Sequence, residues 1–242
     1  QALTLVGQDI YDALIKNYTK KQWGKNPEDL PPWIIQRLPL RFTYNNNYFT
    51  DTYQGIPING YTELLEKLLS GAEINTKADY FSEQTIIKKS AKKIVYTGRI
   101  DEFFGERFGR LEYRSLRFEH QVLKTSNFQG NAVVNHCDLT KKYTRTLEHK
   151  YFLDQSTDST VVSYEYPLEW DPSKIPFYPV NSKNNQVIYN QYKKASSHEK
   201  QFHFAGRLAE FKYYDMHMII QKAIKDFNKL TGHNYASSFR EK

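Results

Sequence analysis

The most constraining feature of this sequence lies near its end, where a short strand, a glycine turn and a long helix follow one another. Residues 202–205 predict the strand, and Gly206 with Arg207 predicts the turn. The helix that follows carries one apolar face and stops at Gly232; the residues of that face are Met216, Ile219, Ile220, Ala223, Phe227 and Leu230. A strand, a glycine turn and a helix form half of the unit from which nucleotide-binding α/β folds are built.

The motifs that would complete a nucleotide site are absent from the sequence. There is no GxGxxG and no P-loop, so the chain is predicted to have no self-contained cradle for a dinucleotide or a triphosphate. No His/Cys cluster has the spacing of a metal site and no GxSxG elbow occurs, so we expect no bound metal. His203 and His217 are expected to be packing or surface residues.

Helices are predicted in the first part of the chain. Tyr11, Ile15 and Tyr18 lie on one helical stripe that ends at Gly24, and a second short helix is expected at residues 32–38. Residues 62–69 predict a third helix, with Thr62 as its candidate N-cap.

Strands dominate the middle of the chain. A buried strand is expected at residues 93–96, and alternating patterns predict four more at 111–118, 132–135, 143–149 and 161–166. With turns between them, these four strands predict an antiparallel sheet.

The charge balance indicates an anionic partner. Lys and Arg number 34 against 27 acidic residues, a net charge of +7, which suits either a nucleic acid or a phosphorylated small molecule. The 19 tyrosines suit both, because their rings can stack on bases or contact sugars and phosphates. A basic, aromatic-rich nucleic-acid-binding module is therefore the alternative function, and it predicts affinity that falls steeply with salt.

Other features bound the compartment and the chemistry. Cys137 is the single cysteine, so no disulfide can form within the chain and a reducing cytoplasm is expected. No apolar run approaches the roughly 18 residues of a membrane span, so no membrane segment is expected. A glycosidase would need two carboxylates across a sugar. The candidates are Asp101, Glu102, Glu148 and Glu165, for which we favour ion-paired or solvated roles.

A series of short strings carries a family resemblance. In chain order they are 18–24 YTKKQWG, 41–43 RFT, 47–49 NYF, 53–57 YQGIP, 96–101 YTGRID, 111–116 LEYRSL, 127–132 NFQGNA, 143–145 YTR, 165–170 EYPLEW, 206–210 GRLAE and 213–217 YYDMH. Together, in this order and spacing, they resemble the C-terminal two-thirds of bacterial UDP-galactopyranose mutases. Each string alone is weak evidence, but the whole set covers essentially the entire chain.

The resemblance implies an α/β (mixed α+β) fold. It consists of an incomplete FAD-binding Rossmann-like domain, a helical substrate-gating segment and an antiparallel or mixed six-stranded sheet domain. The implied division places residues 1–54 in the helical gating domain and 55–107 in the FAD-binding domain. Residues 108–180 then form the sheet domain that binds substrate, and 181–242 the C-terminal part of the FAD-binding domain.

The resemblance also implies an isomerase that interconverts UDP-galactopyranose and UDP-galactofuranose for cell-surface glycan synthesis. In such enzymes N5 of reduced FAD attacks the anomeric carbon and UDP leaves; the sugar opens to an iminium and recloses as a five-membered ring. The protein then supplies positioning and charge compensation. A homodimer is implied for the full-length enzyme, with no nucleic acid or membrane partner.

Functional residues follow from the matched positions. Arg37 and Arg145 resemble the catalytic arginines that compensate the charge of the leaving diphosphate, for which a guanidinium fork is suited. The substrate-binding positions are Tyr18, Trp23, Tyr48, Asn135, Glu165, Tyr178 and Tyr213, with Tyr18 matching the tyrosine that stacks on uracil. The flavin-binding positions are Arg207, Asp215 and Met216, where a helix N-terminus would face the electron-rich flavin carbonyl.

Two departures from the family are visible. Arg99 stands where the family usually has proline, which is expected to change only a turn. The family's glycine-rich loop, its ribose-binding acidic residue and its flavin-proximal histidine have no counterpart here. We therefore expect a chain that lacks the pyrophosphate-binding part, does not necessarily bind FAD, and is inactive alone.

Overall fold

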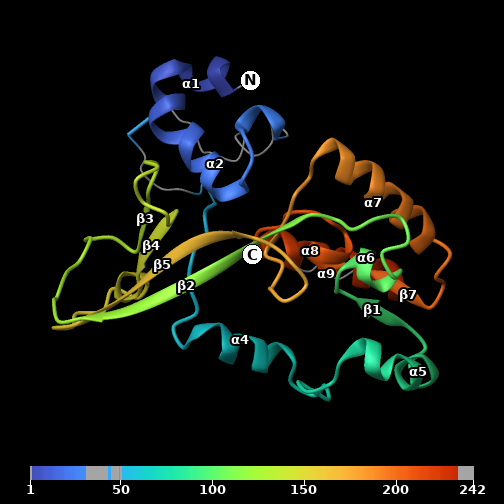
Figure 1. The fold of residues 1–242 in the computed structure, drawn as a ribbon. Helices are drawn as coiled ribbons and strands as arrows, with labels where there is room; N and C mark the ends of the chain where they lie inside the picture. Colours follow the sequence, from blue (N-terminus) through green and yellow to red (C-terminus); the bar gives the residue numbers. More distant parts are fainter. Residues whose placement is uncertain (1, 31–42, 45–48, 50, 234–242) are drawn as a thin grey trace. The chain divides into compact units, whose positions relative to one another are not determined.

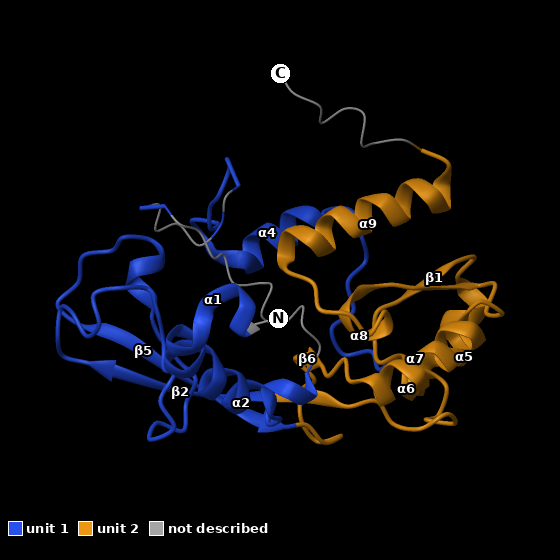
Figure 2. Ribbon diagram, turned by 90° about the horizontal axis from the view of Figure 1, so that it is seen from above, with its two compact units in different colours: residues 1–79, 116–169 blue, residues 80–115, 170–242 orange. Residues whose placement is uncertain are grey.

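The computed structural model describes residues 2–30, 43–44, 49 and 51–233 (Figure 1). The chain divides into two compact units. Unit 1 comprises residues 1–79 and 116–169, and unit 2 comprises residues 80–115 and 170–242 (Figure 2). The division into four segments expected from the resemblance remains a prediction. None of the described helices is long and apolar enough to cross a bilayer.

Unit 1 begins with the predicted helix. Its helices are α1 (Ala2–Ile10), the π-helix η1 (Tyr11–Lys16), α2 (Asn17–Trp23), the 3-10 helix η2 (Pro27–Asp29), α4 (Gly60–Leu68) and the 3-10 helix η3 (His149–Phe152). Tyr11 and Ile15 are buried, as their stripe predicts. Gly24 ends α2 with a φ of 65° and donates its N–H to the Lys20 carbonyl, so the predicted glycine stop is confirmed.

An antiparallel sheet occupies the middle of the chain. Its strands are β2 (Tyr113–Leu123), β3 (Val133–Asn135), β4 (Arg145–Glu148), β5 (Thr160–Glu169) and β6 (Tyr178–Pro179), in the order β3-β4-β5-β2-β6. The pairs β3–β4, β4–β5 and β2–β6 are antiparallel. The predicted antiparallel sheet is therefore confirmed, whereas the described residues provide five strands and do not confirm the expected six.

Unit 2 contains a small parallel sheet with helices around it. Its elements are α5 (Tyr80–Ser90), β1 (Ile94–Tyr96), α6 (Ile100–Phe103), α7 (Lys183–Ser196), β7 (Phe202–Phe204), α8 (Gly206–Ala209) and α9 (Met216–Thr231). Strands β1 and β7 pair in parallel, with Tyr96 opposite Phe204. Aromatic rings fill the space beside them: Phe103 lies 4.8 Å from Phe204 and 4.9 Å from Tyr96, measured between ring centroids.

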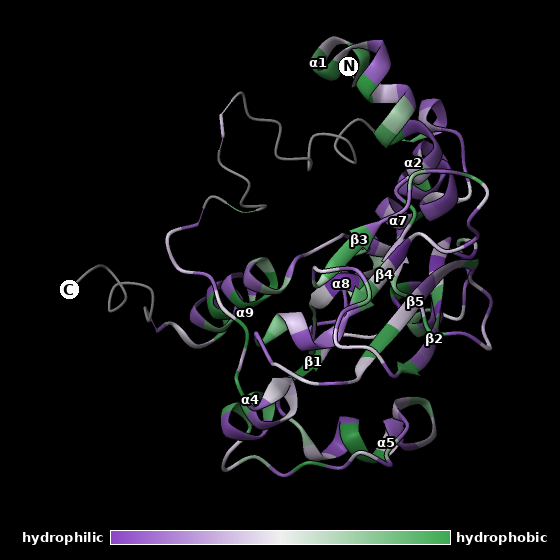
Figure 3. Ribbon diagram, turned by 90° about the vertical axis from the view of Figure 1, so that its left-hand side faces the viewer, coloured by the Kyte–Doolittle hydropathy of each residue, from purple (hydrophilic) through white to green (hydrophobic). Residues whose placement is uncertain are grey.

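The strand–turn–helix at the end of the chain is confirmed, with one difference. Gly206 has a φ of +89° and begins the short helix α8, so the predicted turn is helical. Gly232, with a φ of 74°, ends α9 as predicted. No residue of α9 is buried, and its apolar face is largely exposed; Ile220 is 55% and Phe227 47% exposed. Figure 3 shows hydrophobic and hydrophilic bands alternating along α9.

Several other predictions need correction. Helix α4 begins at Gly60 with Asn59 at the N-cap, so Thr62 lies inside the helix and does not cap it. Helices α5 and α7 were not predicted; α7 mixes polar side chains with few apolar ones, which gives little helical pattern. The helix expected at residues 32–38 lies outside the described residues.

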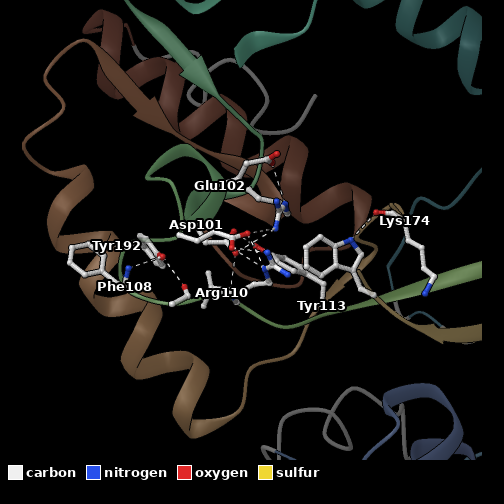
Figure 4. A network of polar contacts seen from close by, with 12 residues as sticks. Asp101, Glu102, Phe108, Arg110, Tyr113, Lys174 and Tyr192 are labelled. Carbon is white, nitrogen blue, oxygen red and sulfur yellow. Dashed lines mark hydrogen bonds and ion pairs between the residues drawn. The ribbon is translucent and has the colours of Figure 1, made fainter. Parts of the chain in front are cut away.

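The expectation that Arg99 changes only a turn is wrong. Its side chain is 9% exposed and its guanidinium carbon lies 4.5 Å from the centre of the Trp170 ring. Its Nη1 lies 3.5 Å from the carboxylate of Asp101, which is fully buried. Asp101 also accepts the Leu111 N–H at 3.0 Å and the Tyr113 hydroxyl at 3.5 Å (Figure 4). Arg99 is therefore part of a buried polar network.

Candidate functional site

Three predicted site residues form one row across neighbouring strands of unit 1. Arg145, the first residue of β4, lies opposite Asn135 on β3 and opposite Glu165 on β5. Its Nε donates to the Asn135 Oδ1 at 3.1 Å, and its Nη1 lies 3.6 Å from the Glu165 Oε2. Directly opposed side chains in an antiparallel sheet lie within contact distance, so the register brings these three together.

A fourth predicted residue reaches the same row from helix α2. The Arg145 Nη2 donates to the Tyr18 hydroxyl at 3.3 Å, joining positions 127 residues apart in the chain. Burial raises the pKa of Tyr18 above its ordinary value, and the neighbouring Arg145 charge opposes that rise. Tyr18 therefore stays a neutral phenol that accepts from Arg145 and keeps its own O–H available as a donor.

Glu165 serves this cluster as a buried counter-charge. Its residue is almost fully buried, and its Oε1 accepts the Thr144 hydroxyl at 3.3 Å. The Thr144 main-chain N–H also donates to the Glu165 carbonyl at 2.9 Å. These bonds fix the carboxylate beside Arg145, because a buried charge is retained when it is paired and hydrogen-bonded. These contacts suit a role for Glu165 in orienting the Arg145 guanidinium.

The geometry suits an anionic ligand. Arg145 leaves 33% of its side chain exposed while its partners hold the guanidinium plane. A guanidinium fixed in this way presents a planar fork of N–H donors that matches phosphate oxygens. Tyr18 places an aromatic ring beside the fork, on which a nucleobase could stack. The cluster of Tyr18, Asn135, Arg145 and Glu165 is called the arginine cluster below.

A second cluster lies within unit 2, where Arg207 of α8 packs on two predicted substrate tyrosines. Its guanidinium carbon is 4.5 Å from the Tyr213 ring centre and 5.8 Å from that of Tyr178. The two rings stack with centroids 5.8 Å apart and planes at 26°. Arg207 also donates to the Phe177 carbonyl at 3.0 Å and to the Tyr214 carbonyl. Arg207 thus fixes the tyrosine pair, whatever further contact it makes.

The two remaining flavin-binding positions stand at the start of α9. Asp215 is the N-cap residue, and its side chain accepts no hydrogen bond from the first turn of the helix. Met216, the first helical residue, is 59% exposed. The first N–H groups of a helix carry partial positive charge and suit an electron-rich oxygen.

Trp23 is the described substrate position that lies outside these two clusters. Trp23 is 6% exposed and belongs to the buried interior of unit 1, as a core aromatic would. Arg37 and Tyr48 lie outside the described residues. Sequence reasoning also missed Thr144, which binds Glu165. Its position between Tyr143 and Arg145 in a matched string was the available signal.

The other candidate chemistries find no support in the described part of the chain. The Glu148 carboxylate accepts the N–H groups of Phe128 at 3.1 Å and Gln129 at 2.8 Å, so it holds a loop. No group of three or more potential metal ligands occurs among the residues that the structure describes. The His203 ring lies 3.0 Å from the Asp226 carboxylate, a packing role.

Residues 13–213 match the family model described as UDP-galactopyranose mutase. An Escherichia coli protein named dTDP-fucopyranose mutase is 38% identical over 231 residues, which cover 93% of this chain and 61% of that protein. A Klebsiella pneumoniae protein named probable UDP-galactopyranose mutase is 36% identical, covering 93% of this chain and 58% of that protein.

The chain spans 57–61% of the length of the named relatives that it matches. Among these relatives is the Mycoplasma genitalium UDP-galactopyranose mutase, at 33% identity. A solved structure of a reduced UDP-galactopyranose mutase superposes with a TM-score of 0.57 at 10% identity, covering 96% of this chain and 66% of that one. This structural likeness shows a shared fold.

Proposed function

Because this chain belongs to the UDP-galactopyranose mutase family, we propose that it forms the substrate-binding part of an isomerase acting on UDP-galactopyranose and UDP-galactofuranose. The single observation that carries the proposal is the arginine cluster. The resemblance implies a catalytic role for Arg145 and substrate contact for its three partners, and these three contact Arg145 in the structure although the four are spread over residues 18–165.

Arg145 would compensate the charge of the diphosphate. Negative charge grows on the leaving UDP as the bond between sugar and phosphate breaks, and a held guanidinium stabilises it without reorganising. Tyr18 would stack on the uracil, and Asn135 and Glu165 would hold Arg145 in place. We also propose that Arg37 supplies a second guanidinium, with Tyr48 contributing to the same site.

We also propose that Tyr178 and Tyr213 contact the phosphates and the sugar, the role that their matched positions imply. Their rings stack on each other and carry the Arg207 guanidinium, so their hydroxyl groups are held on a fixed platform. Phenolic hydroxyls can donate to phosphate oxygens and accept from sugar hydroxyls. Preorganised groups of this kind lower the entropic cost of ordering the ligand.

The residues present fit one side of a flavin. Helix α9 begins with no side-chain cap from Asp215, and the exposed Met216 stands in its first turn, which suits a flavin carbonyl and ring. No GxGxxG cradle for the pyrophosphate occurs in this sequence. When bound, reduced FAD supplies the N5 nucleophile for the anomeric carbon. Arg207, Asp215 and Met216 are the residues of this chain that would hold it.

The finer architecture is also a proposal. We place β1, β7 and α9 in an incomplete Rossmann-like FAD domain, because a parallel strand pair followed by a helix is its repeating unit. A sixth strand of the substrate sheet and a helical gating segment within residues 1–54 complete the proposed arrangement. The single cysteine supports a cytoplasmic enzyme, and a homodimer is proposed for the complete protein.

The nucleotide-sugar itself has two candidates. The relatives include proteins named for UDP-galactopyranose and one named for dTDP-fucopyranose, at comparable identities. Both names describe a nucleotide-linked pyranose, and both ligands carry the diphosphate that Arg145 suits. We propose UDP-galactose as the substrate, and binding of dTDP against UDP decides between the two.

The test is a binding titration with a spectrum. We expect the purified chain to bind UDP with micromolar affinity. Its visible absorption spectrum reports whether FAD is bound. Arg145→Ala should weaken UDP binding at least tenfold with an unchanged far-UV circular dichroism spectrum. Tighter binding of dTDP would transfer the proposal to the second substrate. Binding of single-stranded DNA or RNA that falls steeply with salt, with none of UDP, would overturn it.

A further inference from the structure

Lys21 of α2 is held in a cage of main-chain oxygens. Its Nζ lies 2.6 Å from the carbonyl oxygen of His136, 2.8 Å from that of Asp138, 3.0 Å from that of Tyr143 and 3.2 Å from that of Lys141. An ammonium group has three N–H donors, so the four oxygens share them and surround the charge. Each of these bonds is charge-assisted.

All four oxygens belong to one loop, residues 136–144, and the ends of that loop carry the arginine cluster. The loop joins β3 to β4, and Asn135 pairs with Arg145 where it leaves the sheet. The His136 N–H donates to the Thr144 carbonyl at 2.9 Å and closes the loop. Whatever fixes the loop therefore fixes the position of Asn135 and Arg145.

Lys21 also belongs to the helix that carries Tyr18. Residues three apart lie on the same face of a helix, so the face of α2 that presents Tyr18 to Arg145 also presents Lys21 to the loop. Lys20, which immediately precedes Lys21 in the helix, is exposed to solvent. One side chain thus ties the tyrosine-bearing helix to the hairpin that bears the arginine.

We propose that Lys21 is a positioning residue of the nucleotide site, holding Tyr18 at its distance from Arg145. The inference rests on the proposed function, because it assumes that these two residues bind one ligand. With the ammonium removed, the loop carbonyl oxygens would accept hydrogen bonds from water. The helix and the hairpin would then sample separations at which Tyr18 and Arg145 cannot both contact the nucleotide. Ligand binding would then include the cost of ordering them.

The experiment compares Lys21→Met with Lys20→Met, which removes a neighbouring exposed charge. UDP affinity is measured by calorimetry at a temperature at which circular dichroism shows both variants folded. We expect Lys21→Met to bind UDP about tenfold more weakly, a change of about 1.4 kcal/mol, and Lys20→Met to stay within twofold of the unmodified chain. Affinity of Lys21→Met within twofold would overturn the proposal.

A double-mutant cycle separates positioning from a merely structural role. If Lys21 acts through Tyr18 and Arg145, Arg145→Ala should weaken UDP binding by a smaller factor in the Lys21→Met background than alone. Equal factors in both backgrounds would refute the positioning role. If Lys21→Met does not fold, Lys21→Gln takes its place, because its polar amide avoids burying an apolar group but is shorter, uncharged and unable to hold all four oxygens. Unchanged UDP affinity in Lys21→Gln would then count against the proposal.

The proposed function and the positioning role of Lys21 are refuted by different results. If the unmodified chain does not bind UDP, the proposed function is refuted. If it binds UDP and Lys21→Met binds it equally well, only the role of Lys21 is refuted.

Discussion

Arg99→Ala should destabilise unit 2 strongly, because it removes the cation beside a buried carboxylate. Asp101 is fully buried and would keep the N–H groups of Leu111 and Glu102 and the Tyr113 hydroxyl as partners, none of which carries a charge. Breaking a buried ion pair costs about 3–5 kcal/mol, and a desolvated cation–π contact such as the one with Trp170 adds about 1–2 kcal/mol. Because the Arg99–Asp101 separation is long, at 3.5 Å, we expect a loss of about 4 kcal/mol near pH 7.

The cost should shrink in acid. Burial raises the pKa of Asp101 above its ordinary value of 3.8, an effect that the Arg99 charge opposes, so removal of Arg99 raises it further. A carboxyl group whose pKa is raised by folding stabilises the fold below its unfolded pKa, and that contribution is lost as pH rises through the folded pKa. The stability that Arg99→Ala loses relative to the unmodified chain should therefore shrink as the pH falls from the raised folded pKa of Asp101 towards its unfolded pKa. The change should be up to about 1.4 kcal/mol for each pH unit.

Urea unfolding followed by circular dichroism at pH 7.5 and pH 5 measures both effects. The matched control is Arg110→Ala, which removes a surface arginine paired with Glu106 at 2.8 Å and should leave the free energy of unfolding nearly unchanged. A loss below 1 kcal/mol for Arg99→Ala, or a deficit that grows in acid, would refute the buried-network reasoning.

Three further predictions concern other contacts. Burial and the nearby His120 lower the pKa of His149, whose ring lies 2.6 Å from the Ser163 hydroxyl. The stability that neutral His149 contributes should therefore be present above about pH 6.5 and be lost as pH falls through the folded pKa. His149→Gln should flatten this part of the pH–Tm curve, and an unchanged curve would contradict the prediction. Glu148→Gln should cost about 1–3 kcal/mol in urea unfolding, since the fully buried Glu148 side chain is the anionic acceptor of two part-buried main-chain N–H groups. Arg207→Lys should reduce the near-UV circular dichroism of the stacked tyrosines, because an ammonium cannot hold two carbonyls and a ring together; an unaltered spectrum would argue against this platform.

Local features of the fold could be predicted from the sequence because their causes are local. Gly24 and Gly232 end helices through left-handed backbone conformations that need no distant partner. The strands of the antiparallel sheet follow from alternation. Helix α7 escaped prediction because distant contacts anchor it: the Tyr192 hydroxyl donates to the Gly109 carbonyl at 2.7 Å, 83 residues away.

The site shows the same division. No periodicity places Tyr18 beside Arg145, since the contact depends on how a helix packs against a sheet. The family resemblance supplied those residues, and the strand register explains why two of their partners meet. Arg99 was misjudged because its main partner outside the turn is Trp170, 71 residues later in the chain. Lys21 stood in a matched string, yet only the structure gives it the four oxygens that surround it.

The central claim is that Arg145 binds the diphosphate of a nucleotide while Tyr18 binds its base. The most direct measurement compares the affinity of the chain for UDP with that for uridine, in the unmodified chain and in Arg145→Ala. We expect UDP to bind at least tenfold more tightly than uridine, and Arg145→Ala to remove most of that difference while leaving uridine affinity unchanged. Equal affinities for UDP and uridine in the unmodified chain, or a difference that survives in Arg145→Ala, would contradict the claim.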